Sequence, residues 1–188
     1  MTHIVCHINA LQLPFGACTA PLTFTLPTAG CTLIGRNGIG KSLLLDLLAG
    51  QRSVASGKIE WFTPISWLSQ FAPHQTHDVA DVIGWGESLR ALERIEQGSC
   101  AMGDFELLSD RWSVRSDLAD LLGEAGLRLD AHTQVSTLSG GQLTRLRLLA
   151  LFARQDHFLL LDEPDNHLDV AGIDWLGRQL AHHRGGYL

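Results

Sequence analysis

The chain has 188 residues, a formal net charge of −6, 45% hydrophobic and 18% charged residues, and a mean hydropathy of +0.09. This length is most simply one domain, and the composition is typical of a globular protein with a large core. The apolar runs are too short to span a bilayer, and no leader pattern follows Met1. We therefore expect a cytoplasmic protein. The acidic balance argues against nucleic-acid binding by the chain alone.

The cysteines and the early elements give a first outline of the fold. Cys6, Cys18, Cys31 and Cys100 lack paired Cys-x-x-Cys spacing, which predicts buried reduced thiols rather than a zinc site. Strands are expected over residues 3–13, 22–26, 31–34, 58–62 and 65–69. The leucine-rich stretch 42–49, which Gly50 stops, predicts a helix.

A glycine-rich loop lies between the expected strand 31–34 and the expected helix 42–49. It fits the phosphate-loop pattern of Gly, four free residues and Gly-Lys-Ser. Its residues are Gly35, Arg36, Asn37, Gly38, Ile39, Gly40, Lys41 and Ser42. The glycines let backbone amides approach phosphate oxygens, and the helix start adds positive charge. Lys41 can reach the outer phosphates, and the Ser42 hydroxyl can bind magnesium. The alternative is a turn that binds nothing, which the Lys-Ser pair disfavours.

The second half of the chain predicts mostly helices. Residues 78–128 look helical, with breaks at Gly84, Gly98, Gly103 and Gly123. An amphipathic helix is expected over 140–154, with an apolar stripe made of Leu143, Leu146, Leu149 and Ala150. Residues 157–161 predict a strand covered on both faces, and 170–183 a last helix with a solvated His182-His183 end.

Polar side chains stand at the ends of two expected strands. Asp162 follows the strand 157–161, at the edge where α/β sheets bind ligands, so its carboxylate can hold magnesium. Glu163 comes next, and Gln70 ends the strand 65–69. A simple strand-end cap is the alternative for the two carboxylates. Ser139 and the glycines after it open a helix, which makes a second anion site.

Three motifs in this order resemble the ATP-binding cassette (ABC) ATPases. They are the phosphate loop, Leu138-Ser139-Gly140-Gly141-Gln142, and Phe158-Leu159-Leu160-Leu161-Asp162-Glu163-Pro164. The run Asp162 to Asp169 is similar to the ABC-F branch, whose members usually read Asp-Glu-Pro-Thr-Asn-His-Leu-Asp. The resemblance covers residues 1–188. It implies an α/β phosphate-loop NTPase fold of the ABC type, with a mixed sheet core, an antiparallel β portion and a helical subdomain at 78–138.

The resemblance also implies ATP and Mg²⁺ as cofactors and assigns roles to residues. Glu163 would be the general base, and Gln70 would contact magnesium and the attacking water. Ser42 and Asp162 would hold the magnesium. Phe15 would stack on adenine, with a core phenylalanine as the rival interpretation. The residues that would close over the γ-phosphate held by an opposite domain are Ser139, Gly140, Gly141, Gln142 and Asp169.

The chain departs from the family pattern in three places. It ends at Leu188, before the strand and switch histidine that normally follow, so we expect a truncated cassette from a longer protein, weak in hydrolysis alone. Leu43 and Asp165 stand where threonines are usual, and neither change removes a phosphate or magnesium ligand.

The function that follows is Mg-dependent ATP hydrolysis by a two-domain sandwich acting on the ribosome. The second ABC domain would lie in the same chain or in a homodimer. One alternative is the cytosolic ATP-binding subunit of an ABC transporter, with a membrane subunit as its partner. The other is a degenerate cassette that binds ATP as a non-enzymatic switch.

Overall fold

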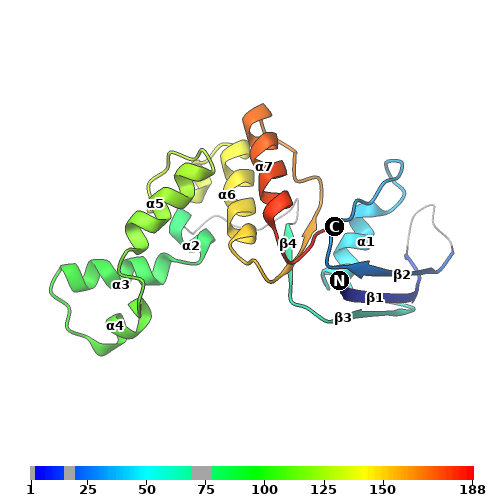
Figure 1. Cartoon of the computed structure of the whole chain (residues 1–188), viewed down its shortest axis with the longest axis horizontal. Helices are drawn as coiled ribbons and strands as arrows, with labels where there is room; N and C mark the ends of the chain where they lie inside the picture. The colour runs from blue at the N-terminus through cyan, green and yellow to red at the C-terminus, as the bar shows by residue number, and fades with distance from the viewer. Residues whose placement is uncertain (1–2, 15–19, 69–77) are drawn as a thin grey trace. The chain divides into compact units, whose positions relative to one another are not determined.

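The computed structural model describes residues 3–14, 20–68 and 78–188 (Figure 1). The chain divides into two compact units. Unit 1 comprises residues 1–71, 154–164 and 177–188, and unit 2 comprises residues 72–153 and 165–176. Within the described part of the chain, no helix is both long and apolar enough to cross a membrane.

Unit 1 contains a three-stranded antiparallel sheet. Its strands are β1 (Ile4–Leu11), β2 (Leu22–Pro27) and β3 (Lys58–Trp61), in the order β2-β1-β3. Ile8 of β1 lies opposite both Phe24 and Ile59. Cys6 and Ile8 are buried while His7 and Asn9 are exposed, which is the two-residue period of a sheet with one covered face. The expected antiparallel portion is confirmed.

Helix α1 (Lys41–Leu48) packs its leucines into the same core as the buried face of β1. Leu44, Leu45, Leu47 and Leu48 recur at helical spacing and are all buried. Burial of each such side chain contributes about 1.5–3 kcal/mol. Gly50, with φ of 68°, follows the helix end, as the sequence predicted. The core therefore fixes the start of α1 beside the glycine-rich loop.

A parallel pair of strands completes unit 1. β4 (Ile65–Leu68) pairs with β5 (Phe158–Leu161), with Ile65 opposite Phe158, and every residue of β5 is buried. Tyr187 bridges in parallel to both Gly30 and Leu159. The sheets thus contain both strand orientations, and the predicted mixed α/β class is confirmed.

The strand expected over residues 31–34 is not formed. Within the described residues this stretch is held by the bridge between Gly30 and Tyr187 and by the Cys31 N–H, which donates to the Tyr187 carbonyl. Beyond Cys31 the ladder stops, and Ile34 is 89% exposed. The apolar composition suggested a buried strand, but backbone pairing ends at Cys31 and the residues after it are exposed.

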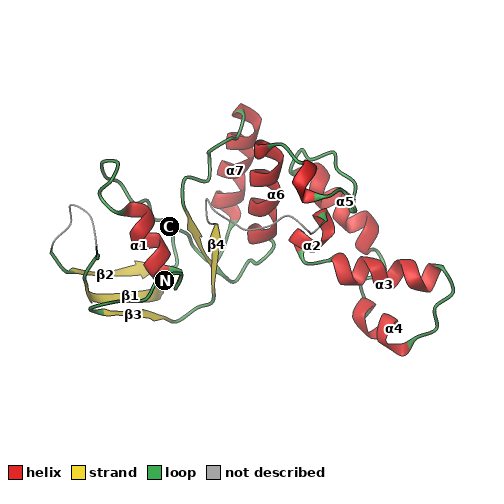
Figure 2. Ribbon diagram, turned by 180° about the vertical axis from the view of Figure 1, so that it is seen from behind, coloured by secondary structure: helices red, strands yellow, loops and turns green. Residues whose placement is uncertain are grey.

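Unit 2 is built from helices, and the named strands all belong to unit 1 (Figure 2). Its helical segments are α2 (Val79–Ile83), α3 (Gly86–Glu96), α4 (Met102–Leu108), α5 (Val114–Glu124), the short 3₁₀ turn Val135–Thr137 and α6 (Gly140–Phe152). The last helix, α7 (Val170–His182), belongs to unit 2 up to residue 176 and to unit 1 after it. The helical character expected for 78–128 is confirmed.

Two of the four expected helix breaks are wrong. Gly84 and Gly98 have φ of 86° and 99° and follow the ends of α2 and α3. Gly103 and Gly123 instead lie inside α4 and α5. A glycine inside a helix costs only about 1 kcal/mol, which tertiary packing offsets. The residue that follows the end of α5 with a left-handed backbone is Gly126, with φ of 69°.

Candidate nucleotide-binding site

The glycine-rich loop of unit 1 turns sharply at two glycines. Gly38 has φ of 80° and Gly40 has φ of 107°, a backbone conformation that other residues rarely adopt. Gly40 is also the N-cap of α1 and carries no side chain that could cap the first amides. The N–H groups at the start of the helix therefore remain available to an anion, and the helix dipole favours negative charge there.

Lys41 lies across the loop. Its Nζ donates to the carbonyl oxygens of Gly35 at 2.9 Å and Arg36 at 3.3 Å. Its backbone belongs to the first turn of α1. Lys41 lines the same pocket as Gly40, the N-cap of α1, so the ammonium group and the positive end of the helix dipole both belong to this site.

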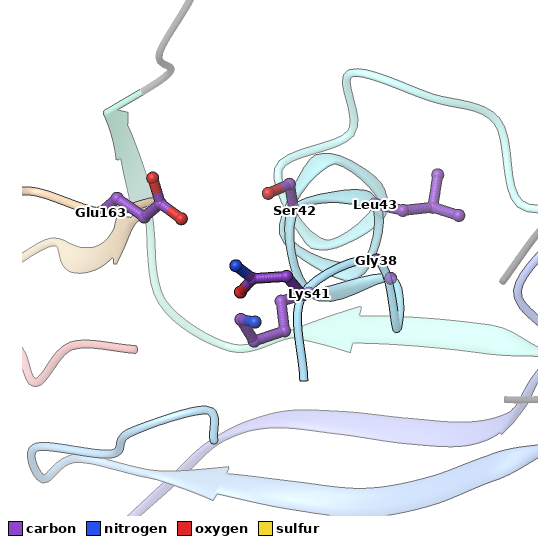
Figure 3. Close-up of a pocket in the computed structure, with 7 residues that line it drawn as sticks. Gly38, Lys41, Ser42, Leu43 and Glu163 are labelled. Carbon is purple, nitrogen blue, oxygen red and sulfur yellow. The ribbon is translucent and has the colours of Figure 1, made fainter. Parts of the chain in front are cut away.

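An open pocket of about 350 Å³ joins this loop to Glu163. Its lining residues are Asn37, Gly38, Gly40, Lys41, Ser42, Leu43 and Glu163. Figure 3 shows the Glu163 carboxylate turned toward the side of the loop that carries the Ser42 hydroxyl, with Leu43 pointing away. Gly35, Arg36 and Ile39 belong to the same loop but do not line the pocket. Residues far apart in the sequence thus converge on one site.

The two carboxylates after β5 are placed differently. Asp162 directly follows the strand and is partly buried, and it is not among the pocket residues. Glu163 is exposed and has φ of 47°, a strained left-handed conformation for a residue with a side chain. Such strain persists where the surroundings enforce it and clusters at functional sites. The turn therefore presents Glu163, rather than Asp162, to the pocket.

The donor set suits a magnesium ion that arrives with its nucleotide. In the described parts of the chain, no three His, Cys, Asp or Glu side chains are grouped so as to hold a metal. Mg²⁺ is commonly held by one or two protein oxygens together with substrate phosphates and water. The Ser42 hydroxyl meets that requirement inside the pocket, and Asp162 stands beside the Glu163 that lines it.

The motif Ser139 to Gln142 forms the capped start of α6 in unit 2. The Gln142 N–H donates to the Ser139 hydroxyl at 3.3 Å, and the Ser139 N–H donates to the Gln142 side-chain oxygen at 3.0 Å. This reciprocal capping box fixes the first turn of the helix. The predicted helix start is confirmed.

A second pocket, of about 380 Å³, opens at this helix start. Its lining residues are Gly126, Leu127, Ser139, Gly141, Gln142, Arg145, His167 and Asp169. A Cβ on Gly141 would lie 2.7 Å from the His167 carbonyl oxygen, whereas one on Gly140 would meet the His167 side chain at an ordinary 3.6 Å. The close approach of the two segments therefore requires glycine at 141.

Arg145 of α6 contacts both the segment after α5 and the start of α7 at this pocket, and this role was not predicted from the sequence. One guanidinium nitrogen pairs with Asp169 Oδ1, and the other donates to the Ala125 carbonyl at 3.2 Å. Asp169 also accepts the Gly172 N–H at 2.8 Å, so it caps the start of α7. The available signal was spacing, because Arg145 follows Gln142 by three positions and shares its helix face.

Gln70 and Phe15 lie outside the described residues. Their predicted contacts with magnesium, water and adenine stay predictions. The other predicted site residues are grouped by the fold into two sets, one in each unit.

The family model described as "ABC transporter" matches residues 21–166. The ATP-binding protein YdiF of Bacillus subtilis is 32% identical over 98% of this chain and 33% of its own length. ABC transporter F family member 4 of Arabidopsis thaliana is 33% identical over 82% of this chain and 20% of its own length. The chain thus spans a third or less of these curated relatives.

Solved structures agree in fold. A metal-chelate type ABC transporter in an inward-facing conformation superposes with a TM-score of 0.66 and 26% identity, over 99% of this chain and 71% of its own. The archaeal ribosome recycling factor aABCE1, in complex with the ribosomal stalk protein aP1, gives a TM-score of 0.64 and 25% identity, over 100% of this chain and 33% of its own. With the matched family model, these likenesses show that the chain belongs to the ABC transporter family as an ATP-binding cassette.

Proposed function

We propose that this cassette binds MgATP in the pocket of unit 1 and hydrolyses it with Glu163 as general base. The observation that supports this most directly is the shared pocket, in which the Glu163 carboxylate faces the loop that carries Lys41 and Ser42. ABC cassettes generally are ATPases, and the matched family adds weight to the enzymatic reading.

The chemistry divides among these groups. The loop amides and Lys41 would hold the phosphates, and Ser42 with Asp162 would hold the magnesium, which would supply charge neutralisation for phosphoryl transfer. Glu163 accepts a proton from the attacking water as its oxygen bonds to the γ-phosphorus, and the bond to the bridging oxygen breaks to release ADP. Gln70 is proposed to orient that water, and Phe15 to stack on adenine.

The partner that we propose is a second ABC domain. Ser139, Gly140, Gly141, Gln142 and Asp169 would close over an ATP held by the partner's phosphate loop. The support is that the second pocket is lined by members of this set at the N-terminus of α6, where an anion is favoured. In this arrangement residues 1–188 act as one cassette in the cytoplasm, and 78–138 form its helical subdomain.

We further propose that the cassette is of the ABC-F type and acts on the ribosome. The run Asn166-His167-Leu168-Asp169 fits that branch, and an F family member is among its relatives. A ribosome recycling factor shares the fold. The transporter alternative is supported by the likeness to a transporter structure. Sedimentation of the purified protein with ribosomes or with membranes separates the two proposals.

The enzymatic proposal is tested by ATP binding and turnover of Glu163→Gln and Asp162→Asn. Glu163→Gln keeps the side-chain shape and removes the base, so turnover should fall about 10²- to 10⁴-fold while ATP binding persists. Asp162→Asn should weaken MgATP binding itself. Glu106→Gln, on the exposed surface of α4, is the matched control and should change neither quantity.

Three outcomes decide against parts of this proposal. Wild-type turnover by Glu163→Gln would show that Glu163 is not the base. Equal loss of ATP binding in both variants would overturn the division of labour between the carboxylates. If the unmodified protein binds ATP but does not hydrolyse it, even with a second cassette present, the non-enzymatic switch is favoured.

A further inference from the structure

Residues 130–134 of unit 2 lead from α5 toward the Ser139–Gln142 motif and are fastened to α2. The Val79 N–H donates to the Thr133 carbonyl and the Ala80 N–H to the Ala131 carbonyl, both at 3.0 Å. An antiparallel bridge also joins Asp78 to Gln134. We name residues 130–134 the α2-bound loop. The loop is thus hydrogen-bonded to the first turn of α2.

The link from this loop to the motif is short and internally bonded. The Thr137 hydroxyl donates to the Gln134 carbonyl at 2.7 Å, and the Leu138 N–H donates to the Val135 carbonyl at 3.2 Å. Val135 is buried. Ser139 follows at once as the N-cap of α6. A short, internally bonded link therefore joins the α2-bound loop to the start of α6.

His132 holds this loop between two carboxylates. Its Nε2 lies 2.7 Å from Glu93 Oε1 on α3, and its Nδ1 lies 3.5 Å from Asp78 Oδ2 at the N-cap of α2. A neutral imidazole has one N–H and can donate to only one of these partners. The geometry therefore fits the doubly protonated ring, which can serve both.

The carboxylates around the ring favour that form, and the Arg90 cation beside Asp78 acts against it. Arg90 of α3 pairs with Asp81 at 2.7 Å and lies 3.6 Å from Asp78, and Asp130 accepts the His132 backbone N–H at 2.8 Å. The Asp78 side chain is only 11% exposed, so its charge needs neighbours of opposite sign. The hydrogen bond to Glu93, reinforced by Asp78, raises the pKa of His132 above its ordinary value.

We propose that protonated His132 is a positioning residue that clamps the α2-bound loop to α2 and α3 and so sets the start of α6. Loss of its proton loosens the clamp. Because the folded state raises the pKa of His132, its stabilising contribution is complete below the ordinary histidine pKa, about 6.5. That contribution is lost as the pH rises through the raised value. Any effect of this clamp on how the Ser139–Gln142 motif closes over a partner's ATP rests on the function proposed above.

The experiment measures the clamp in the whole 188-residue chain without nucleotide. NMR follows the His132 ring through a pH titration, and hydrogen exchange gives protection factors for the Val79 and Ala80 amides. We expect His132 to titrate above 6.5 and both protection factors to fall together with its deprotonation. His182→Gln is the matched control, since His182 is exposed on α7 and is expected to leave both amides unchanged.

Two substitutions separate positioning by charge from simple packing. His132→Gln should lower the protection of both amides at low pH and remove its pH dependence. His132→Lys keeps a cation at high pH and should restore protection there. A His132 pKa at or below 6.5, or equal protection in wild type and His132→Gln, overturns the clamp. Since no nucleotide is present, neither result depends on whether ATP is bound or hydrolysed.

Discussion

At the scale of single residues, Lys41 is the cationic side chain of the phosphate loop that lines the pocket, whereas Arg36 of the same loop does not line it. The sequence contains two lysines, Lys41 and Lys58. Lys41 lies across the loop and lines the pocket, whereas Lys58 is exposed on β3 and pairs with Glu60. The chain therefore offers a natural control for any test of the loop lysine.

We predict that Lys41→Ala weakens MgATP binding about ten- to a hundredfold, since a hydrogen bond to a charged group contributes about 1.5–3 kcal/mol. Lys58→Ala should leave the affinity unchanged. Isothermal titration calorimetry gives the affinities, and circular dichroism checks the fold. Equal affinity of Lys41→Ala and wild type would contradict the assigned role.

A second prediction concerns the cysteines. Burial raises the pKa of the Cys6 thiol to about 11, so very little thiolate is present near neutral pH. Cys100 is exposed. Iodoacetamide at pH 8 should therefore alkylate Cys100 much faster than Cys6 in the native protein, as measured by peptide mass mapping. Comparable rates would show that Cys6 is not held in the core as described.

At the scale of elements, the start of helix α6 depends on a single close approach. A Cβ at Gly141 would collide with the His167 backbone, which cannot move aside as a flexible side chain could. Gly140, its neighbour, has ordinary space, and Gly123 inside α5 has open space. These three helical positions therefore differ in whether a larger residue can replace glycine.

We predict that Gly141→Ala destabilises the protein by about 1–3 kcal/mol, the usual cost of overpacking. Gly123→Ala should stabilise it by about 0.5–1 kcal/mol through helix propensity, and Gly140→Ala should fall between them. Urea unfolding followed by circular dichroism ranks the three variants. A Gly141→Ala midpoint at or above that of Gly123→Ala would refute the assignment.

The sequence predicted elements where patterning and packing agree. The leucines of α1, the alternation in β1 and the apolar β5 are each readable as local patterns, and the structure has these elements. Residues 31–34 have the composition of a strand but no ladder beyond Cys31, because pairing depends on distant residues. In α6, Leu148 and Phe152 are buried in addition to the expected Leu146 and Leu149, while Leu143 and Ala150 are only partly buried.

The sites were predictable to a similar extent. Motif spacing indicated the phosphate loop and Glu163, which the fold brings into one pocket. Arg145 and His167 were missed, since their contacts depend on tertiary neighbours. The solvated end expected for His182-His183 is wrong for His183, which is buried with Nε2 2.8 Å from the His157 carbonyl oxygen. A polar residue type gives no sign of such a backbone partner.

At the scale of the whole molecule, the division into two units predicts where nucleotide stabilises the chain. The phosphate-loop pocket belongs to unit 1. A ligand at one hundred times its dissociation constant stabilises what it binds by about 2.7 kcal/mol. Saturating MgATP should therefore increase amide protection most in α1 and least in α3 and α4 of unit 2, by hydrogen exchange with mass spectrometry. Equal protection of both units would contradict this prediction.

The pairing of β4 with β5 has a consequence for how the chain is made. Ile65 and its partner Phe158 lie on either side of the long continuous segment of unit 2, residues 72–153. At ~5–20 residues per second, a ribosome needs roughly 5–20 s to synthesise the residues between them. During that interval β4 has been synthesised before its parallel partner exists, while helices α2 to α6 can already form. Unit 1 therefore begins to fold first but can complete its sheet only after β5 is made, and until then the unpaired edge of β4 is a surface that needs protection from aggregation.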